Sequence, residues 1–240
     1  MTNCSNGEDD PDTDDFVPPQ EYKLGSDLIS RIILTDQQII NVMTKNLVGT
    51  PENVNAAVPT EFCDVLYIPN ATHNTLPPII FKIQKNIDEP FIVRVIHYCT
   101  LVYAKYKKHP LIVLLGISNF TTSVFSSTVP CVKFPFAKEI TSCFWTQHCL
   151  LLSSSMLATL SQYIEQLHPL AALGYFMCSQ ALSMNMLDYG KHDNTIKLLY
   201  TIAQGNIKEA LGTEDEKLKG ISNICDNADS QLIKIKHCIE

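Results

Sequence analysis

Ile79-Ile-Phe-Lys-Ile-Gln-Lys85 and the earlier run Glu61-Phe-Cys-Asp-Val-Leu-Tyr-Ile68 form the centre of the predicted sheet. Both runs are short, apolar and rich in β-branched or aromatic residues, which is typical of strands. The connection over residues 69–78 is rich in Asn and Pro and therefore predicts an exposed loop. We expect strands over about residues 62–68 and 79–85, paired antiparallel.

A helix and a buried strand follow. Over residues 89–107, apolar side chains recur at three- and four-residue spacing, and lysines favour the C-terminal end, so this segment predicts a helix. The continuous apolar run Leu111–Ile117 predicts a strand buried on both faces. A helix that joins two strands of one sheet is a crossover, so the strands over 79–85 and 111–117 should be parallel.

The rest of the sequence predicts further helices and strands before and after this core. Two helical pieces fill residues 24–48, the first begun by Asp27 and the second by a capping box of Thr35 and Gln38. A further strand is expected over residues 129–136. Helices are expected over residues 150–166, 170–188, 193–211 and 214–238.

These elements predict an α/β fold, with a small mixed sheet flanked by helices and a helical C-terminal extension. The expected organisation is a disordered acidic tail over residues 1–20, an α/β core over 21–146, and a helical extension over 147–240 packed on that core. The tail carries six acidic residues and no Lys or Arg, which leaves 19 acids against 18 bases in the body. Such a tail buries too little apolar surface to offset its ordering entropy.

The nine cysteines lack paired spacing, and several lie on apolar stretches, so they predict reduced, mostly buried thiols (Cys63, Cys99, Cys149 and Cys178). The N-terminus lacks a basic segment followed by an apolar one, and no apolar stretch has the length of a membrane span. We therefore expect an intracellular protein, nuclear or cytoplasmic, with no membrane partner. The sequence does not indicate an oligomeric state.

Polar residues on the two predicted strands suggest a chemistry. Side chains alternate along a strand, so Lys82 and Gln84 share one face, and Asp64 lies on the neighbouring strand. Nucleases that hydrolyse phosphodiesters with Mg²⁺ hold the metal between carboxylates of adjacent strands, and a residue two places after the second acid orients the water or phosphate. Asp64 and Gln84 fit the first and third roles, and Lys82 takes the place of the second acid.

At these residues the chain resembles the PD-(D/E)XK nuclease superfamily, and in particular its recombination-promoting nuclease and transposase-like branch, whose second strand reads acid-x-Gln. The resemblance continues in the helix with Arg94 and Tyr98 and in the strand over 110–117. His168–Tyr175 and Asn194–Tyr200 look like the helical C-terminal part of fungal members. The resemblance implies a restriction-endonuclease-like fold over about residues 24–210, and it implies that Arg94 contacts phosphate.

Lys82 departs from the family pattern. An ammonium group cannot ligate Mg²⁺ and repels a cation beside Asp64, so we expect a Lys82–Asp64 ion pair in the place of the metal. The sequence predicts a degenerate nuclease or transposase-like protein with impaired catalysis. One alternative is an active Mg²⁺-dependent DNA endonuclease in which Glu61 or Glu89 supplies the missing carboxylate, with Asp64 as the other metal ligand.

A second alternative is a non-enzymatic scaffold that binds proteins through the acidic tail or the helical extension. DNA is the partner that the resemblance implies, and Mg²⁺ is its cofactor only if the chain is active. The basic residues near the end of the predicted helix, Lys105, Lys107 and Lys108, form a small patch beside aromatic residues.

Overall fold

The computed structural model of the chain describes residues 26–49, 54–57, 64–69, 76–142, 144–160, 166–181 and 183–211. In chain order its elements are α1 (Asp27–Thr35), α2 (Gln37–Val48), β1 (Val54–Ala57), β2 (Val65–Pro69), β3 (Ile79–Ile87), α3 (Glu89–Tyr106), β4 (Leu111–Phe120), α4 (Thr122–Ser126), β5 (Thr128–Pro130), β6 (Lys138–Ile140), β7 (His148–Ser153), α5 (Ser154–Ala158), α6 (Pro169–Ser179), the 3₁₀ helix η3 (Met184–Met186) and α7 (Asn194–Leu211).

The described strands form one mixed sheet of seven strands in the order β1-β2-β3-β4-β7-β6-β5. β1, β2 and β3 pair antiparallel, and β3, β4 and β7 pair parallel. β6 and β5 then continue the sheet antiparallel from β7. The predicted antiparallel pairing of the first two strands and the parallel pairing across the helix are both confirmed.

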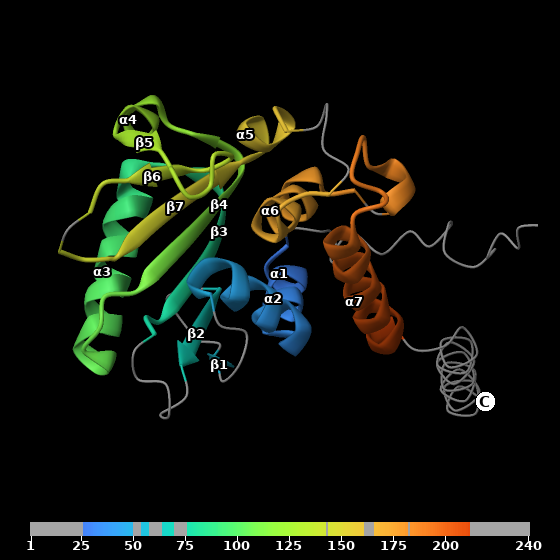
Figure 1. Cartoon of the computed structure of the whole chain (residues 1–240), viewed down its shortest axis with the longest axis horizontal. Coiled ribbons are helices and arrows are strands. Elements are labelled where there is room, and N and C mark those ends of the chain that lie inside the picture. The colour runs from blue at the N-terminus through green and yellow to red at the C-terminus, as the bar shows by residue number, and fades with distance from the viewer. Residues whose placement is uncertain are drawn as a thin grey trace, which may run out of the picture. The chain divides into compact units, whose positions relative to one another are not determined.

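Helices cover both faces of this sheet (Figure 1). α3 packs on one face, where Leu66, Ile80, Ile112 and Leu151 meet Phe91 and other buried side chains of the helix. α1, α2 and α6 lie on the other face. Because β4 lies between the two helical layers, residues 111–115 are all buried, as the continuous apolar run predicts.

The two helices predicted within residues 24–48 are present as α1 and α2, but their N-terminal caps differ from the predicted ones. Ser26 caps α1, because its Oγ accepts from the Ile29 N–H at 3.4 Å. Asp36 caps α2 by accepting from two backbone amides, and the Thr35 hydroxyl instead donates to backbone carbonyls of the preceding turn. The caps predicted at Asp27 and Thr35 are therefore each one residue from the observed ones.

Three sequence predictions are wrong in extent. The strand over 129–136 is confined to β5, because the chain turns within residues 131–136. Where the sequence predicts a helix over 150–166, residues 148–153 instead form the strand β7, which pairs with β4 in the centre of the sheet. The helix that follows, α5, is five residues long. The helix over 170–188 ends at Ser179, and Gln180 adopts a left-handed conformation with φ of 51°.

The helix predicted over 193–211 is confirmed as α7, and the one over 214–238 lies outside the described residues. The chain divides into two compact units, Met1–Ile202 and Ala203–Glu240, and all seven described strands belong to the first. Of the second unit, the structure describes residues 203–211 of α7. The predicted tail over residues 1–20 also lies outside the described residues.

The prediction of reduced cysteines is confirmed for those that the structure describes. Cys99, Cys131 and Cys149 are buried thiols outside any disulfide, and Cys178 is a half-buried one. Burial raises the pKa of the Cys149 thiol well above its ordinary value and raises that of Cys178 to about 12. These thiols therefore stay protonated, as expected for small packing residues rather than nucleophiles. Cys63 lies outside the described residues.

Candidate functional site

Asp64 and Lys82 meet on the face of the sheet that α3 covers. The β2–β3 register pairs Val65 with Phe81, so the preceding residue, Asp64, comes opposite Lys82. The Lys82 Nζ lies 3.1 Å from the Asp64 Oδ1. Asp64 is 4% exposed, whereas 21% of the Lys82 side chain reaches solvent. The predicted ion pair is confirmed.

The second carboxylate oxygen also has a donor. The backbone N–H of Ile83 donates to the Asp64 Oδ2. A buried carboxylate without donors would lose several kcal/mol of solvation, and the Lys82 ammonium and the Ile83 amide compensate for that loss at Asp64. This arrangement holds the start of β2 against the middle of β3.

These residues do not fit a divalent metal. A metal ion in this place needs carboxylate oxygens free to coordinate it, and both oxygens of Asp64 accept hydrogen bonds, one from a cation. Across the described residues, no group of three His, Cys, Asp or Glu side chains comes close enough to hold a metal ion. The Asp64–Lys82 pair offers one positive and one negative charge rather than two carboxylates.

Gln84 and Arg94 do not take part in the ion pair. Gln84 is half-buried on β3, two residues after Lys82, and therefore on the same face. Arg94 is exposed on α3, and its guanidinium lies 5.6 Å from the centre of the Phe91 ring. An exposed arginine on the helix that covers Lys82 can contact an anion, as the resemblance implies.

The two acids considered as substitutes for the missing carboxylate have different positions. Glu61 lies outside the described residues. Glu89 is exposed in the first turn of α3 and lines a cavity of about 330 Å³ with Ser123, Val124 and Ile140 of α4 and β6. The sheet order places β4 and β7 between β6 and the two strands that carry Asp64 and Lys82. The structure therefore brings Asp64 and Lys82 together and places Glu89 with a different set of residues.

Comparisons with protein-family models, with curated proteins and with solved structures found no match to this chain. Among the helices of the described segments, none has the length and apolarity needed to span a membrane.

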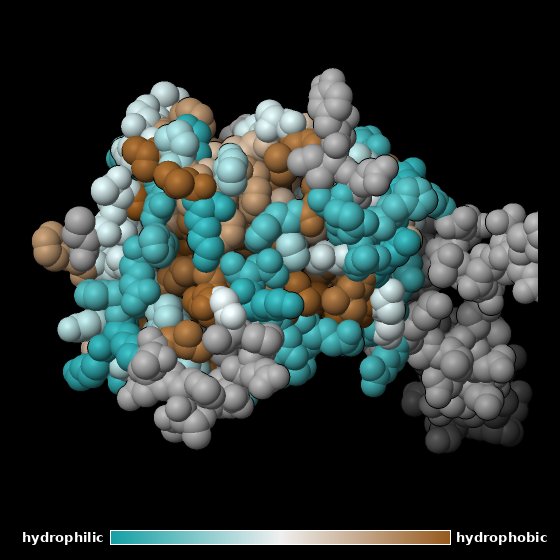
Figure 2. Space-filling model, in the orientation of Figure 1, coloured by the Kyte–Doolittle hydropathy of each residue, from teal (hydrophilic) through white to brown (hydrophobic). Residues whose placement is uncertain are grey.

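The sequence did not predict an apolar cavity on the other face of the sheet. It measures about 530 Å³ and lies on the face of the sheet opposite Asp64, lined mainly by apolar side chains such as Leu47, Leu111 and Leu150. Figure 2 shows hydrophobic side chains at the surface between hydrophilic ones in the middle of the face in view. At the rim of this cavity His148 Nδ1 lies 2.7 Å from Glu139 Oε1. The cavity has no contact with the ion pair, so it does not bear on the nuclease chemistry.

Proposed function

We propose that this protein is a degenerate member of the PD-(D/E)XK nuclease superfamily that retains nucleic-acid binding and has lost metal-dependent cleavage. The observation that carries the proposal is the Lys82–Asp64 ion pair, which takes the place of a metal site. The order of elements supports the ancestry: an antiparallel β1-β2-β3 meander, a crossover helix, and a buried parallel strand. The restriction-endonuclease-like fold is part of this proposal.

The chemistry of the ion pair explains the loss of activity. In the metal-dependent reaction, Mg²⁺ lowers the pKa of a bound water and stabilises the charge that develops on the phosphate. The Lys82 ammonium has a fixed positive charge, but it cannot bind and activate water as a metal does. Phosphate binding through positive charge requires no metal, so binding of nucleic acid can persist after cleavage is lost.

The first test measures cleavage. Purified protein is incubated with plasmid DNA and Mg²⁺ or Mn²⁺, and the wild type is compared with Asp64→Ala and Lys82→Glu. We expect no cleavage by the wild type. Cleavage by the wild type that Asp64→Ala abolishes would establish the alternative, an active endonuclease that draws its second carboxylate from elsewhere, such as Glu61 or Glu89.

The second test measures metal binding by a restored site. Lys82→Glu places a carboxylate opposite Asp64, so Mn²⁺ should raise the thermal stability of this variant relative to the same variant in EDTA. Lys85→Glu is the matched control, because Lys85 is exposed on the same strand. A folded Lys82→Glu protein whose Mn²⁺ response equals that of the control would count against a metal-site ancestry.

The third test separates the binding module from the scaffold alternative. Binding of labelled DNA is measured in EDTA, with and without residues 1–20, over a range of salt concentrations. The proposal expects metal-independent binding by the body that weakens with salt. The scaffold alternative would be favoured if the protein without residues 1–20 does not bind nucleic acid and the full chain binds proteins through those residues.

A further inference from the structure

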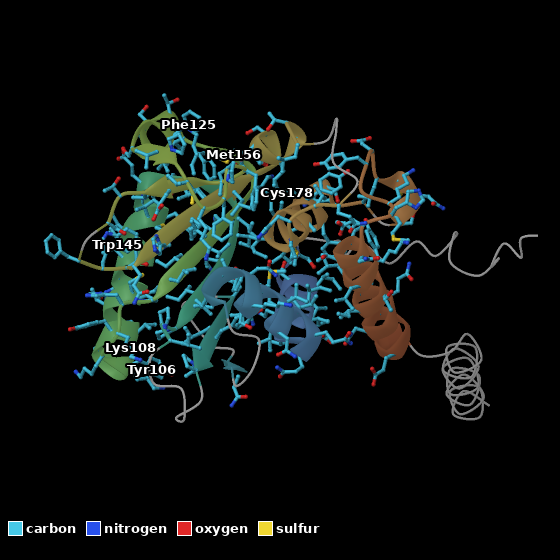
Figure 3. All side chains as sticks on the ribbon, in the orientation of Figure 1. Tyr106, Lys108, Phe125, Trp145, Met156 and Cys178 are labelled. Atoms are coloured by element: carbon cyan, nitrogen blue, oxygen red, sulfur yellow. The ribbon has the colours of Figure 1, made fainter. Side chains whose placement is uncertain are left out.

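An aromatic cluster lies against the C-terminal half of α3, away from the Asp64–Lys82 pair. We define the aromatic cluster as Tyr103, His109, Phe144 and Trp145. These four residues, with Cys99 and Thr100, line a cavity of about 290 Å³. Figure 3 shows Trp145 beside α3, with Tyr106 and Lys108 at the C-terminal end of the helix.

Two rings of the aromatic cluster are exposed, whereas His109 and Trp145 are half-buried and Trp145 also packs against the core. Phe144 is 89% exposed, and Tyr103 is 43% exposed. The Tyr103 and His109 rings stack, with centroids 4.5 Å apart and planes inclined by 17°. Large aromatic side chains contribute to stability by burial, so an exposed phenylalanine beside a partly open cavity indicates a surface that a ligand can cover.

Three lysines lie at or just beyond the C-terminal end of α3, close in sequence to Tyr103 and His109: Lys105, Lys107 and Lys108. Lys105 and Lys107 are exposed, and in the part of the chain that the structure describes neither forms an ion pair. Lys108 is half-buried, and its Nζ donates to the Leu76 carbonyl at 3.4 Å. The charge favours a polyanion as the ligand.

The spacing of rings and charges suits a short nucleic-acid strand. Tyr103 and Lys107 are four residues apart in sequence, or about 6 Å along a helix at 1.5 Å per residue. About two stacked nucleotides, at about 3.4 Å each, cover the same length. A strand on this surface can therefore place a base on the rings and phosphates near the lysines.

We propose that the aromatic cluster and the adjacent lysines bind single-stranded nucleic acid. Bases stack on Phe144, Tyr103 and Trp145, and phosphates pair with Lys107, which lies one helical turn after Tyr103. A duplex fits less well, because its bases are already stacked on one another and present no free faces to the rings. An acidic peptide would use the lysines but leave the rings uncovered. The inference shares its ligand class with the proposed function, but it rests on different residues and does not depend on the nuclease ancestry.

The chain provides its own probe, because Trp145 is its one tryptophan. An oligothymidylate of about 12 nucleotides, within the range of known single-strand sites, is titrated into the full chain at low salt. We expect quenching of the tryptophan fluorescence as bases stack on the ring. An oligouridylate of the same length separates RNA from DNA as the preferred strand. A duplex and polyglutamate test the two competing ligand classes.

Variants are compared by the anisotropy of a labelled oligonucleotide, which does not depend on Trp145. Phe144→Ala should weaken binding at least about fivefold, the lower end of the effect of losing one stacked base. Phe125→Ala is its matched control, since Phe125 is also an exposed phenylalanine, 46% accessible, on α4. Lys107→Gln should weaken binding and reduce the slope of log K against log salt by about 0.7, whereas Lys45→Gln on α2 should not.

Several results would overturn the inference. These are binding without a change in tryptophan fluorescence, equal losses in Phe144→Ala and Phe125→Ala, or tighter binding of the duplex or of polyglutamate than of the single strand. Cleavage by the wild-type protein would refute the loss of activity but leave this site unaffected. Conversely, loss of single-strand binding in Phe144→Ala supports this site whatever the metal response of Lys82→Glu.

Discussion

Replacement of Lys82 by methionine tests whether the ion pair holds the sheet together. Methionine keeps most of the length and packing of the lysine stem and removes the charge. The Asp64 carboxylate, 4% exposed, then keeps the Ile83 amide as its donor and loses the cation. Removing one partner of a fully buried pair costs about 3–5 kcal/mol. Because 21% of the Lys82 side chain is exposed, water replaces part of the lost interaction, and we expect a loss of about 2–3 kcal/mol.

The free energy of unfolding is measured by urea denaturation, followed by the fluorescence of Trp145, at constant pH. Asp64→Asn in the Lys82→Met background should recover a substantial part of the loss, since an amide oxygen still accepts from Ile83 but carries no charge. The four proteins of this cycle give the coupling between the two side chains. Lys85→Met is the control for removing a lysine from β3 and should change stability by less than about 0.5 kcal/mol.

The reasoning is refuted if Lys82→Met is as stable as Lys85→Met. It is also refuted if Asp64→Asn destabilises the wild type and the Lys82→Met protein equally, because the coupling is then zero. Either result would mean that the carboxylate is stabilised without the ammonium, and that Lys82 does not substitute for a metal ion.

Three further predictions concern stability. Burial, and secondarily Lys133, lowers the pKa of His168 from 6.5, so the unfolded chain binds a proton at a higher pH than the folded protein does. The free energy of unfolding should therefore fall as the pH drops below about 6.5 and through the folded pKa. His168→Asn, which keeps an acceptor for the Leu170 amide at the start of α6, should remove this pH dependence in urea titrations. Asp193→Ala should cost about 3 kcal/mol by urea denaturation, because this buried carboxylate accepts from Leu167 and from two amides at the start of α7; Asp193→Asn should cost less. Gly49→Ala should lower stability by about 1 kcal/mol in calorimetry, since φ is 86° and the added Cβ meets no atom within 4 Å, which leaves backbone strain as the cost.

The centre of the fold was predictable from the sequence because its signals agree with one another. Residues 111–117 form a long apolar run after a proline, and α3 has a sustained helical period between Asp88 and Lys107. The approach of Asp64 and Lys82 was also predictable, since antiparallel pairing of two short strands and the alternation of side chains leave few registers.

β7 could not be predicted in the same way. Its core is the four apolar residues 149–152, a run short enough to belong to a buried strand or to a helix. The following Met156-Leu-Ala158 continued the apolar pattern and favoured a helix. The change from strand to helix is marked by serine instead. Ser153 ends β7 and caps α5, because its hydroxyl accepts from the Met156 amide.

The position of Glu89 required three-dimensional information. Sequence places it just after β3 and therefore near Gln84, but its side of α3 depends on how the helix lies across the sheet. The aromatic cluster is equally non-local, since it joins the end of α3 to residues 144–145, which precede β7. Both depend on packing between elements, which no local pattern encodes.

The place of β7 in the strand order has a consequence for synthesis of the chain. β5 and β6 leave the ribosome before β7, yet they join the sheet through it. A nascent chain that ends near residue 140 can assemble β1 to β4, but one edge of β4 stays unpaired. That edge is a long and apolar template for pairing with other chains. The half-made protein should therefore be most prone to aggregation in the interval between the synthesis of β4 and that of residue 153.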